Sequence, residues 1–210
     1  SLFWMYNDCW GEIGWSIVDY YLKRKPSYYF VKRAFAPLKL IMRREGSLVR
    51  VLGANDTLGT VQLELEYGFV SYDGKHKDCK HATVVLKPNS RSIVIEFVGN
   101  NDRAADGLYY VKPLMCDNKV LPAVLREKPF RQIQIPSAKL TVTDFQNNHR
   151  TMKFTISSDK FAHAVHFNMQ DKAVFSDEYF DMLPGESREI VICNSKSGFN
   201  IDELEVRSLV

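Results

Sequence analysis

The spacing of hydrophobic residues changes near residue 37 of the chain. Upstream of it, Tyr28, Val31 and Phe35 recur at helical spacing and share one face. Pro26 suits the first turn of a helix, where its missing N–H is not needed, and Pro37 ends the pattern. Downstream, alternation with a period of two replaces helical spacing. The pattern predicts a short helix followed by a chain made mainly of β-strands.

The clearest alternation lies at residues 61–68, where every second residue is apolar. Such a strand turns one face to a core and the other to water. Turn-forming residues separate it from weaker candidates of similar length. These further strands are expected at 38–43, 48–53, 82–86, 92–98 and 108–111. Short strands at this spacing predict a β-sandwich over residues 38–135.

A second boundary is expected between Pro129 and Pro136, after which the alternation restarts. Residues 136–210 contain apolar positions for five or six strands, which fits a second, smaller sandwich. One of these candidate strands contains His163 and His166. Side chains three residues apart on a strand point to opposite faces of the sheet. We therefore do not expect His163 and His166 to share a metal ion.

The first fifteen residues contain all three tryptophans of the chain. Their flat rings could form the wall of a binding site or a hydrophobic plug against another part of the protein. Residues 2–5 are predicted as a strand whose sheet partners are not present in this chain. The order is then strand, aromatic loop, helix, which repeats in α/β barrels and doubly wound sheets. Ser1 is preceded by neither an initiator Met nor a leader, so we expect the chain to be a piece of a longer one.

Composition excludes several classes of function. The chain has 210 residues, 45% of them hydrophobic, and a net charge of +3. Its basic clusters are short, so a nucleic-acid partner is not expected. No apolar run approaches the roughly 20 residues that a membrane-spanning helix needs, so no membrane span is expected.

The cysteines give no recognisable metal-binding motif. Cys9, Cys79, Cys116 and Cys193 lie far apart and lack C-x-x-C spacing. The sequence does not decide whether Cys79 and Cys116 form a disulfide, so the redox compartment of the protein also stays undecided. His76 and His81 flank Cys79 in a predicted loop that could hold zinc, but a fourth ligand is missing nearby. We therefore expect neither a metal site nor a cofactor.

Two groups of motifs resemble a known family. The first group comprises WMYNDCW at 4–10, WSIVDYY at 15–21, KPSYY at 25–29 and KRAFAP at 32–37. It resembles the end of the catalytic barrel in β-mannosidases of glycoside hydrolase family 2. The second group, SDKFA at 158–162 and FSDEYFDMLPGE at 175–186, resembles the final immunoglobulin-like domain of the same enzymes.

The resemblance implies that the chain has three parts and that the catalytic residues lie elsewhere in the parent enzyme. Residues 1–37 would be the last strand, loop and helix of a (β/α)8 catalytic barrel, followed by immunoglobulin-like sandwiches at 38–135 and 136–210. In such hydrolases two glutamates on earlier barrel strands act as acid/base and nucleophile, the former preceded by Asn. This sequence contains no Asn-Glu dipeptide. The resemblance thus implies a retaining exo-β-mannosidase-like parent, and a chain without catalytic residues that is inactive alone.

The aromatic loop is the candidate substrate-binding site. Trp4 and Trp10 could stack on the apolar face of a sugar, whereas Asn7 and Asp8 could bind hydroxyl groups or hold the loop. Asp8 and Glu12 are carboxylates of this loop, but a retaining glycosidase needs a pair about 5–5.5 Å apart, which the resemblance assigns to the absent strands. The expected partners are a β-mannoside or related glycoside and the rest of the barrel.

Several alternatives remain open at this point. The sandwiches could themselves bind carbohydrate, or they could form a purely structural immunoglobulin-like pair. The parent enzyme could equally be an exo-β-glucosaminidase or a β-galactosidase, since these share the architecture. The resemblance is compatible with a periplasmic, extracellular or lysosome-like compartment and selects none of them. The loop at 175–186 is interpreted as a turn and a plug for the end of the sandwich rather than as a site.

Overall fold

The mainly β class is confirmed by the computed structural model. It describes residues 2–11, 14–100, 103, 105–115, 120–148, 151–168, 173–193 and 204–209. The chain forms two compact units, one of residues 36–136 and the other of residues 1–35 together with 137–210. Each unit contains two antiparallel sheets that enclose a hydrophobic core. Within the described residues, no helix has the length and apolar character needed to cross a membrane.

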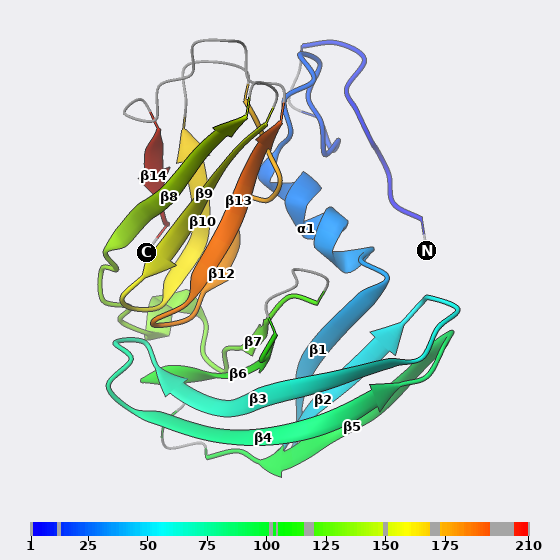
Figure 1. Ribbon diagram of the computed structural model, residues 1–210, viewed down its shortest axis with the longest axis vertical. Helices are drawn as coiled ribbons and strands as arrows, with labels where there is room; N and C mark the ends of the chain where they lie inside the picture. Colours follow the sequence, from blue (N-terminus) through cyan, green and yellow to red (C-terminus); the bar gives the residue numbers. More distant parts are fainter. Residues whose placement is uncertain are drawn as a thin grey trace. The chain divides into compact units, whose positions relative to one another are not determined.

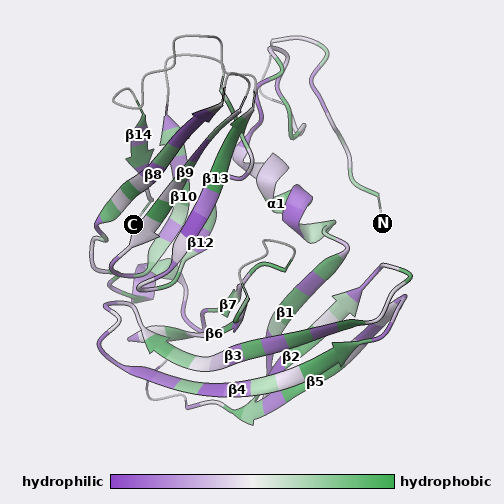
Figure 2. Ribbon diagram, in the orientation of Figure 1, coloured by the Kyte–Doolittle hydropathy of each residue, from purple (hydrophilic) through white to green (hydrophobic). Residues whose placement is uncertain are grey.

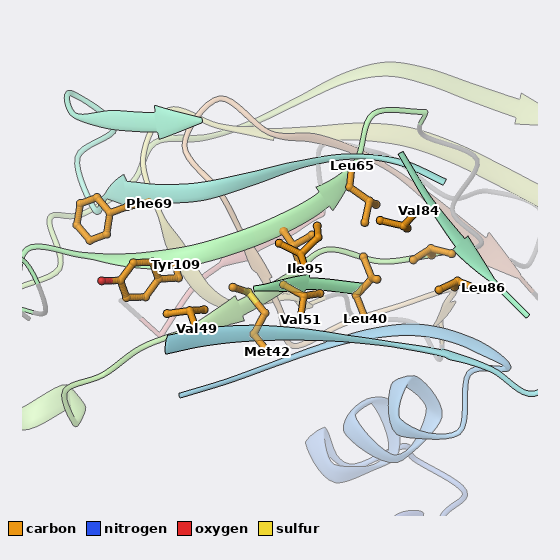
Figure 3. Close-up of a cluster of buried hydrophobic side chains, with 12 residues drawn as sticks. Leu40, Met42, Val49, Val51, Leu65, Phe69, Val84, Leu86, Ile95 and Tyr109 are labelled. Atoms are coloured by element: carbon orange, nitrogen blue, oxygen red, sulfur yellow. The ribbon is translucent and has the colours of Figure 1, made fainter. Parts of the chain in front are cut away.

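The 36–136 unit has one sheet in the order β1-β2-β5 and another in the order β4-β3-β6-β7 (Figure 1). The strands are β1 (Leu38–Glu45), β2 (Leu48–Asn55), β3 (Val61–Ser71), β4 (Lys77–Leu86), β5 (Ser90–Val98), β6 (Gly107–Pro113) and β7 (Ala123–Leu125). A 3-10 turn, η2 (Phe130–Gln132), follows them. Alternate side chains from both sheets meet in the core, among them Val51 from β2 and Leu65 from β3 (Figure 3).

The alternation that predicted these strands is visible along β1 and β3 as bands of polar and apolar residues (Figure 2). The largest difference from the predicted strand bounds is at β4, which begins at Lys77 rather than Ala82. Residues 77–81 are polar or charged and exposed, so hydropathy does not mark them as a strand. Pairing does: the β3–β4 ladder runs without a break from Val61 opposite Leu86 to Val70 opposite Lys77. What was predicted as a loop is therefore an exposed edge of the sheet.

The other unit combines the helix α1 (Pro26–Ala34) with seven strands. These are β8 (Leu140–Asn148), β9 (Thr151–Ser158), β10 (Ala162–Asn168), β11 (Val174–Phe175), β12 (Phe180–Met182), β13 (Ser187–Cys193) and β14 (Glu205–Arg207). They form sheets in the orders β11-β13-β9-β8 and β12-β10-β14. The predicted helix is confirmed: Pro26 is its first residue, and Lys32 and Arg33 occupy its last turn, where the helix dipole favours positive charge.

Two stretches of this unit differ from what alternation alone suggests. Residues 2–5 pair with no other strand among the described residues, which provide only isolated bridges here, the first between Asn7 and Val18. The sheet partners expected for a strand at 2–5 do not belong to this chain. In β10 the register shifts between Ala162 and Val165, with Ala164 at φ 51°. The shift interrupts strict alternation, so His163 and His166 are both half-buried instead of lying on opposite faces.

Candidate functional site

The aromatic segment, residues 2–22, is held by backbone hydrogen bonds rather than by a sheet. The amide of Asp8 donates to the carbonyl of Val18 at 3.1 Å, and the amide of Val18 donates to Tyr6 at 2.9 Å. Lys25, just before α1, donates its amide to the carbonyl of Ile17 at 2.9 Å. These bonds fold the segment back on itself and tie it to the start of the helix.

A buried carboxylate fixes the centre of this segment. Asp8 is only 4% exposed. Its Oδ2 accepts a hydrogen bond of 2.9 Å from Nζ of Lys25, which also donates to Ser16 Oγ at 2.8 Å and to the carbonyl of Gly14 at 3.2 Å. The bond from Lys25 holds the pKa of Asp8 below its ordinary value. Asp8 is thus ionised and turned into the loop.

Glycine is required opposite this carboxylate. A Cβ added to Gly14 would lie 2.2 Å from Oδ1 of Asp8, well inside van der Waals contact. Any larger residue there would push the carboxylate away from Lys25. No local pattern signals this requirement, because Gly14 and Asp8 are brought together only by the fold of the loop.

The other candidate residues of the loop lie at the surface. Trp4 and Trp10 are 79% and 67% exposed, and Trp15 is 85% exposed. Asn7 is exposed as well, and its side-chain amide donates to the carbonyl of Asp8 at 3.2 Å. The Trp4–Met5 peptide bond is cis. Glu12 lies outside the described residues.

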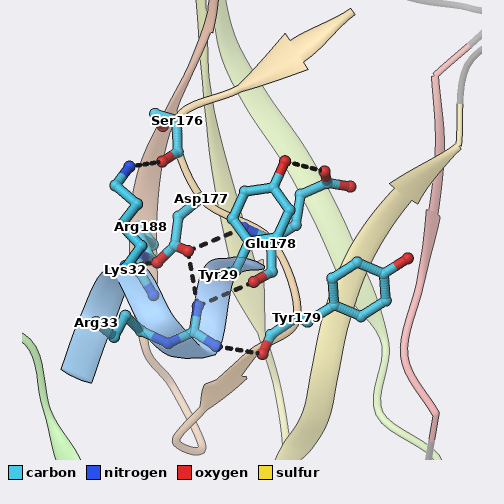
Figure 4. A network of polar contacts seen from close by, with 8 residues as sticks. All are labelled: Tyr29, Lys32, Arg33, Ser176, Asp177, Glu178, Tyr179 and Arg188. Atoms are coloured by element: carbon cyan, nitrogen blue, oxygen red, sulfur yellow. Dashed lines mark hydrogen bonds and ion pairs between the residues drawn. The ribbon is translucent and has the colours of Figure 1, made fainter. Parts of the chain in front are cut away.

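The helix α1 is bound to the connection between β11 and β12, residues 176–179, by a dense polar network (Figure 4). Nη1 of Arg33 contacts Oδ1 of Asp177 at 2.7 Å, and its two terminal nitrogens donate to the carbonyls of Glu178 and Tyr179 at 2.9 and 2.8 Å. On the other side, Nη2 of Arg188 contacts Oδ2 of Asp177 at 2.6 Å. One buried aspartate therefore neutralises two arginines, one from the helix and one from β13.

Glu178 extends the network towards the body of the sandwich. Its Oε2 accepts a hydrogen bond of 2.6 Å from the hydroxyl of Tyr29, and its Oε1 accepts one of 3.2 Å from the amide of Phe167. Burial raises the pKa of Glu178 and of Tyr29, since both charged forms lose hydration there. The segment 175–186, interpreted from sequence as a turn and a plug, contains the strand β12 and is also the attachment site of α1.

A cavity of about 490 Å³ lies beside this attachment. Its lining includes Arg24 and Tyr29 from the N-terminal part, and His166, Glu178 and Tyr179 from the sandwich. The rings of His166 and Tyr179 stack, with centroids 5.0 Å apart and planes within 6°. Sequence reasoning missed this arrangement. The only available signal was the opposite charge of the motifs at 32–37 and 175–186, which does not by itself specify a pairing.

Removing the hydroxyl of Tyr29 tests the attachment. Tyr29→Phe leaves Oε2 of the half-buried Glu178 without its donor, so we expect a loss of about 1–3 kcal/mol in the free energy of unfolding. Tyr28→Phe is the matched control, because its hydroxyl makes none of the described hydrogen bonds. Urea unfolding followed by far-UV circular dichroism measures both variants. Equal stability of the two variants would contradict the assigned role of the Tyr29 hydroxyl.

Comparison with known proteins gives a consistent result. A family model described as an Ig-fold domain, of the mannosidase type, matches residues 135–210. β-Mannosidase B of Aspergillus flavus is 26% identical over 216 residues, covering 94% of this chain and 26% of the relative. The corresponding enzyme of Emericella nidulans is 26% identical over 210 residues, covering 91% of this chain and 25% of the relative.

Solved structures agree with the sequence comparison. The β-D-mannosidase of Dictyoglomus thermophilum superposes with a TM-score of 0.85 at 28% identity, covering 98% of this chain and 26% of that one. An exo-chitosanase of Amycolatopsis orientalis shares the fold, with a TM-score of 0.63 at 17% identity, covering 90% of this chain and 27% of that one. By sequence and by structure, the chain is therefore related to β-mannosidases of glycoside hydrolase family 2, of which it spans about a quarter.

Proposed function

We propose that the chain is a non-catalytic part of a retaining exo-β-mannosidase-like hydrolase. In this proposal residues 1–37 are the tail of the catalytic (β/α)8 barrel, residues 38–135 an immunoglobulin-like sandwich, and residues 136–210 a second one. Similarity to β-mannosidases over 94% of the chain supports the parent activity. The two glutamates that carry out hydrolysis would belong to the remaining three quarters of the parent protein, which also forms the rest of the barrel.

The sugar-facing surface in this proposal is the aromatic segment. Trp4 and Trp10 would present indole faces to a pyranose ring, and Asn7 would offer its amide to a hydroxyl group. Asp8 would act mainly by positioning, since its carboxylate is buried and bonded to Lys25. The observation that carries the proposal is this combination of exposed indoles on a segment that a partly buried ion pair, Lys25 with Asp8, holds in place.

The sandwich at 136–210 would serve the site indirectly. Through Asp177 and Glu178 it binds α1, and α1 continues directly from the segment that Lys25 ties to Asp8. The sandwich at 136–210 would thus set the position of the aromatic segment without contacting the sugar. A carbohydrate-binding role for the sandwiches themselves has no comparable support, because the exposed tryptophans lie in the aromatic segment.

Kinetics of the purified chain and of the full-length parent enzyme test the proposal. The chain alone should release no aryl alcohol from an aryl β-mannoside. In the full-length enzyme, Trp4→Ala and Trp10→Ala should each lower kcat/KM about 3- to 10-fold, which corresponds to losing about 0.5–1.5 kcal/mol of ring stacking.

The controls separate the sugar-facing role from general damage. Trp15→Ala, also strongly exposed, should leave kcat/KM unchanged. Aryl β-glucosaminide and β-galactoside substrates should be hydrolysed less well than the mannoside. Turnover by the chain alone would refute the non-catalytic assignment. Unchanged kcat/KM of both Trp4→Ala and Trp10→Ala would refute the proposed sugar-binding role of these two side chains.

A further inference from the structure

A second cluster of reactive side chains lies on the sheet β4-β3-β6-β7, in the 36–136 unit. Glu66 of β3 and Cys79 and His81 of β4 each offer one ligand atom, and these atoms all lie within 4.8 Å of one another. We propose that Glu66, Cys79 and His81 form a zinc-binding site. This site is independent of the proposed glycosidase role.

The β3–β4 register brings the three residues together. Glu66 lies directly opposite His81, and Cys79 precedes His81 by two residues, so all three side chains project from the same face. Gly68 lies opposite Cys79 at φ 151°. A Cβ there would lie 2.0 Å from the carbonyl oxygen of Asp78, so glycine permits the close approach of β4 at this level.

This set differs from the motif that the sequence offered. His-x-x-Cys-x-His suggested His76 as a ligand and lacked a further one. In the structure His76 is not a member of the cluster. Glu66, which is ten or more residues away in sequence, completes the set across the strand pair. The missing ligand was therefore on a neighbouring strand rather than in the motif.

The geometry requires only small side-chain rotations. The distance between Nε2 of His81 and Oε2 of Glu66 is 3.8 Å. Ligand atoms placed tetrahedrally around zinc at ordinary bond lengths lie about 3.3–3.8 Å apart. Cys79 and His81 are both exposed, so their side chains can rotate to close the remaining gap without repacking the core. Three protein ligands leave the fourth position to water, as in open zinc sites.

The ligand types favour zinc over hard cations. A thiolate and an imidazole bind zinc well, whereas Mg²⁺ and Ca²⁺ prefer oxygen ligands throughout. Thiolate and carboxylate together supply two negative charges, which would balance a divalent ion. Because both Cys79 and His81 are accessible, the ion can enter directly from solvent.

Positive and polar groups surround the carboxylate of Glu66. They fix its orientation, and the positive ones disfavour the binding of a cation. Its Oε1 faces Lys77 at 2.8 Å, the Tyr110 hydroxyl at 2.9 Å and Lys112 at 3.5 Å. Burial works to raise the pKa of Glu66, but the bonds from Lys77 and Tyr110 outweigh it and lower the pKa. Oε2 remains directed towards His81. The two lysines repel a cation, so affinity should fall short of that of a closed structural site.

Zinc titration of the reduced chain tests the site. Competition with a chromophoric chelator should show one Zn²⁺ bound per chain. Cys79→Ser and His81→Asn should each weaken binding by at least about tenfold, as expected when a zinc site loses a ligand or its support. The matched controls are Cys9→Ser, which removes the other exposed free thiol, and His76→Ala, which removes the neighbouring histidine. Both controls should bind zinc like the parent chain.

Cobalt substitution and thiol protection provide readouts at Cys79 itself. Co²⁺ should produce a thiolate-to-metal charge-transfer absorption that Cys79→Ser abolishes and Cys9→Ser retains. Zn²⁺ should slow alkylation of Cys79, measured by peptide mapping. Unchanged circular dichroism would confirm that the variants fold. The proposal is overturned if no zinc binds, or if binding and the cobalt spectrum survive both Cys79→Ser and His81→Asn.

Discussion

Replacing Asp177 with alanine should lower the free energy of unfolding by about 3–5 kcal/mol, because it leaves a buried guanidinium without its counter-ion. The side chain of Arg188 is only 10% exposed and contacts Asp177 at 2.6 Å. Arg33, whose Nη1 lies 2.7 Å from Oδ1 of Asp177, loses the same partner. Urea unfolding followed by circular dichroism measures the loss, and hydrogen exchange of the α1 amides locates it.

A surface ion pair in the same unit is the control for this variant. Lys153 and Glu189 lie 3.2 Å apart with side chains 43% and 47% exposed. Glu189→Gln should cost no more than about 1 kcal/mol, since exposed pairs are screened by water. If Asp177→Ala cost as little as the control, the attachment of α1 would not depend on the ion network, and the proposed positioning role of the accessory domain would lose its physical basis.

Replacing Leu65 with alanine should destabilise the 36–136 unit by about 2–5 kcal/mol. Leu65 is fully buried in the core shown in Figure 3, to which both sheets contribute side chains. Truncation removes its buried methyl groups and leaves a cavity that the surrounding strands can fill only in part. Urea unfolding measures the effect, and hydrogen exchange of β3 and β4 should increase.

Leu58→Ala is a chemically identical control in the same unit. Leu58 is 88% exposed, so its truncation should change stability by no more than about 0.5 kcal/mol. Equal effects at the two leucines would mean that β3 does not turn Leu65 into the core. The comparison therefore tests the alternation at 61–68, on which the prediction of a sandwich was built.

Sequence patterns identified strands where apolar residues alternate and failed where they do not. The strand around Leu65 was predicted because one of its faces is buried. Residues 77–81 were missed because an exposed, polar edge strand has no hydropathy signal. The faces of His163 and His166 were misassigned because a register shift in β10 cannot be read from alternation.

For the candidate site, the sequence indicated which segment is involved but not the contacts within it. The cluster of tryptophans identified the aromatic segment, and Trp4, Asn7 and Trp10 are exposed. The burial of Asp8 against Lys25 was not foreseen, since it depends on how the loop folds back. Residues 2–5 form no ladder among the described residues, because a strand is defined by its partner, and the partners expected for it do not belong to this chain.

By itself, the sequence determined the features that depend on near neighbours: the helix that begins at Pro26, the alternating strands and the resemblance to β-mannosidases. Only the tertiary structure decided which distant groups meet. Arg33 and Asp177 are separated by 144 residues, and Tyr29 and Glu178 by 149. Local spacing fixes which face of an element is apolar, but contacts at such separations depend on strand register, bulges and loop paths, which no local pattern specifies.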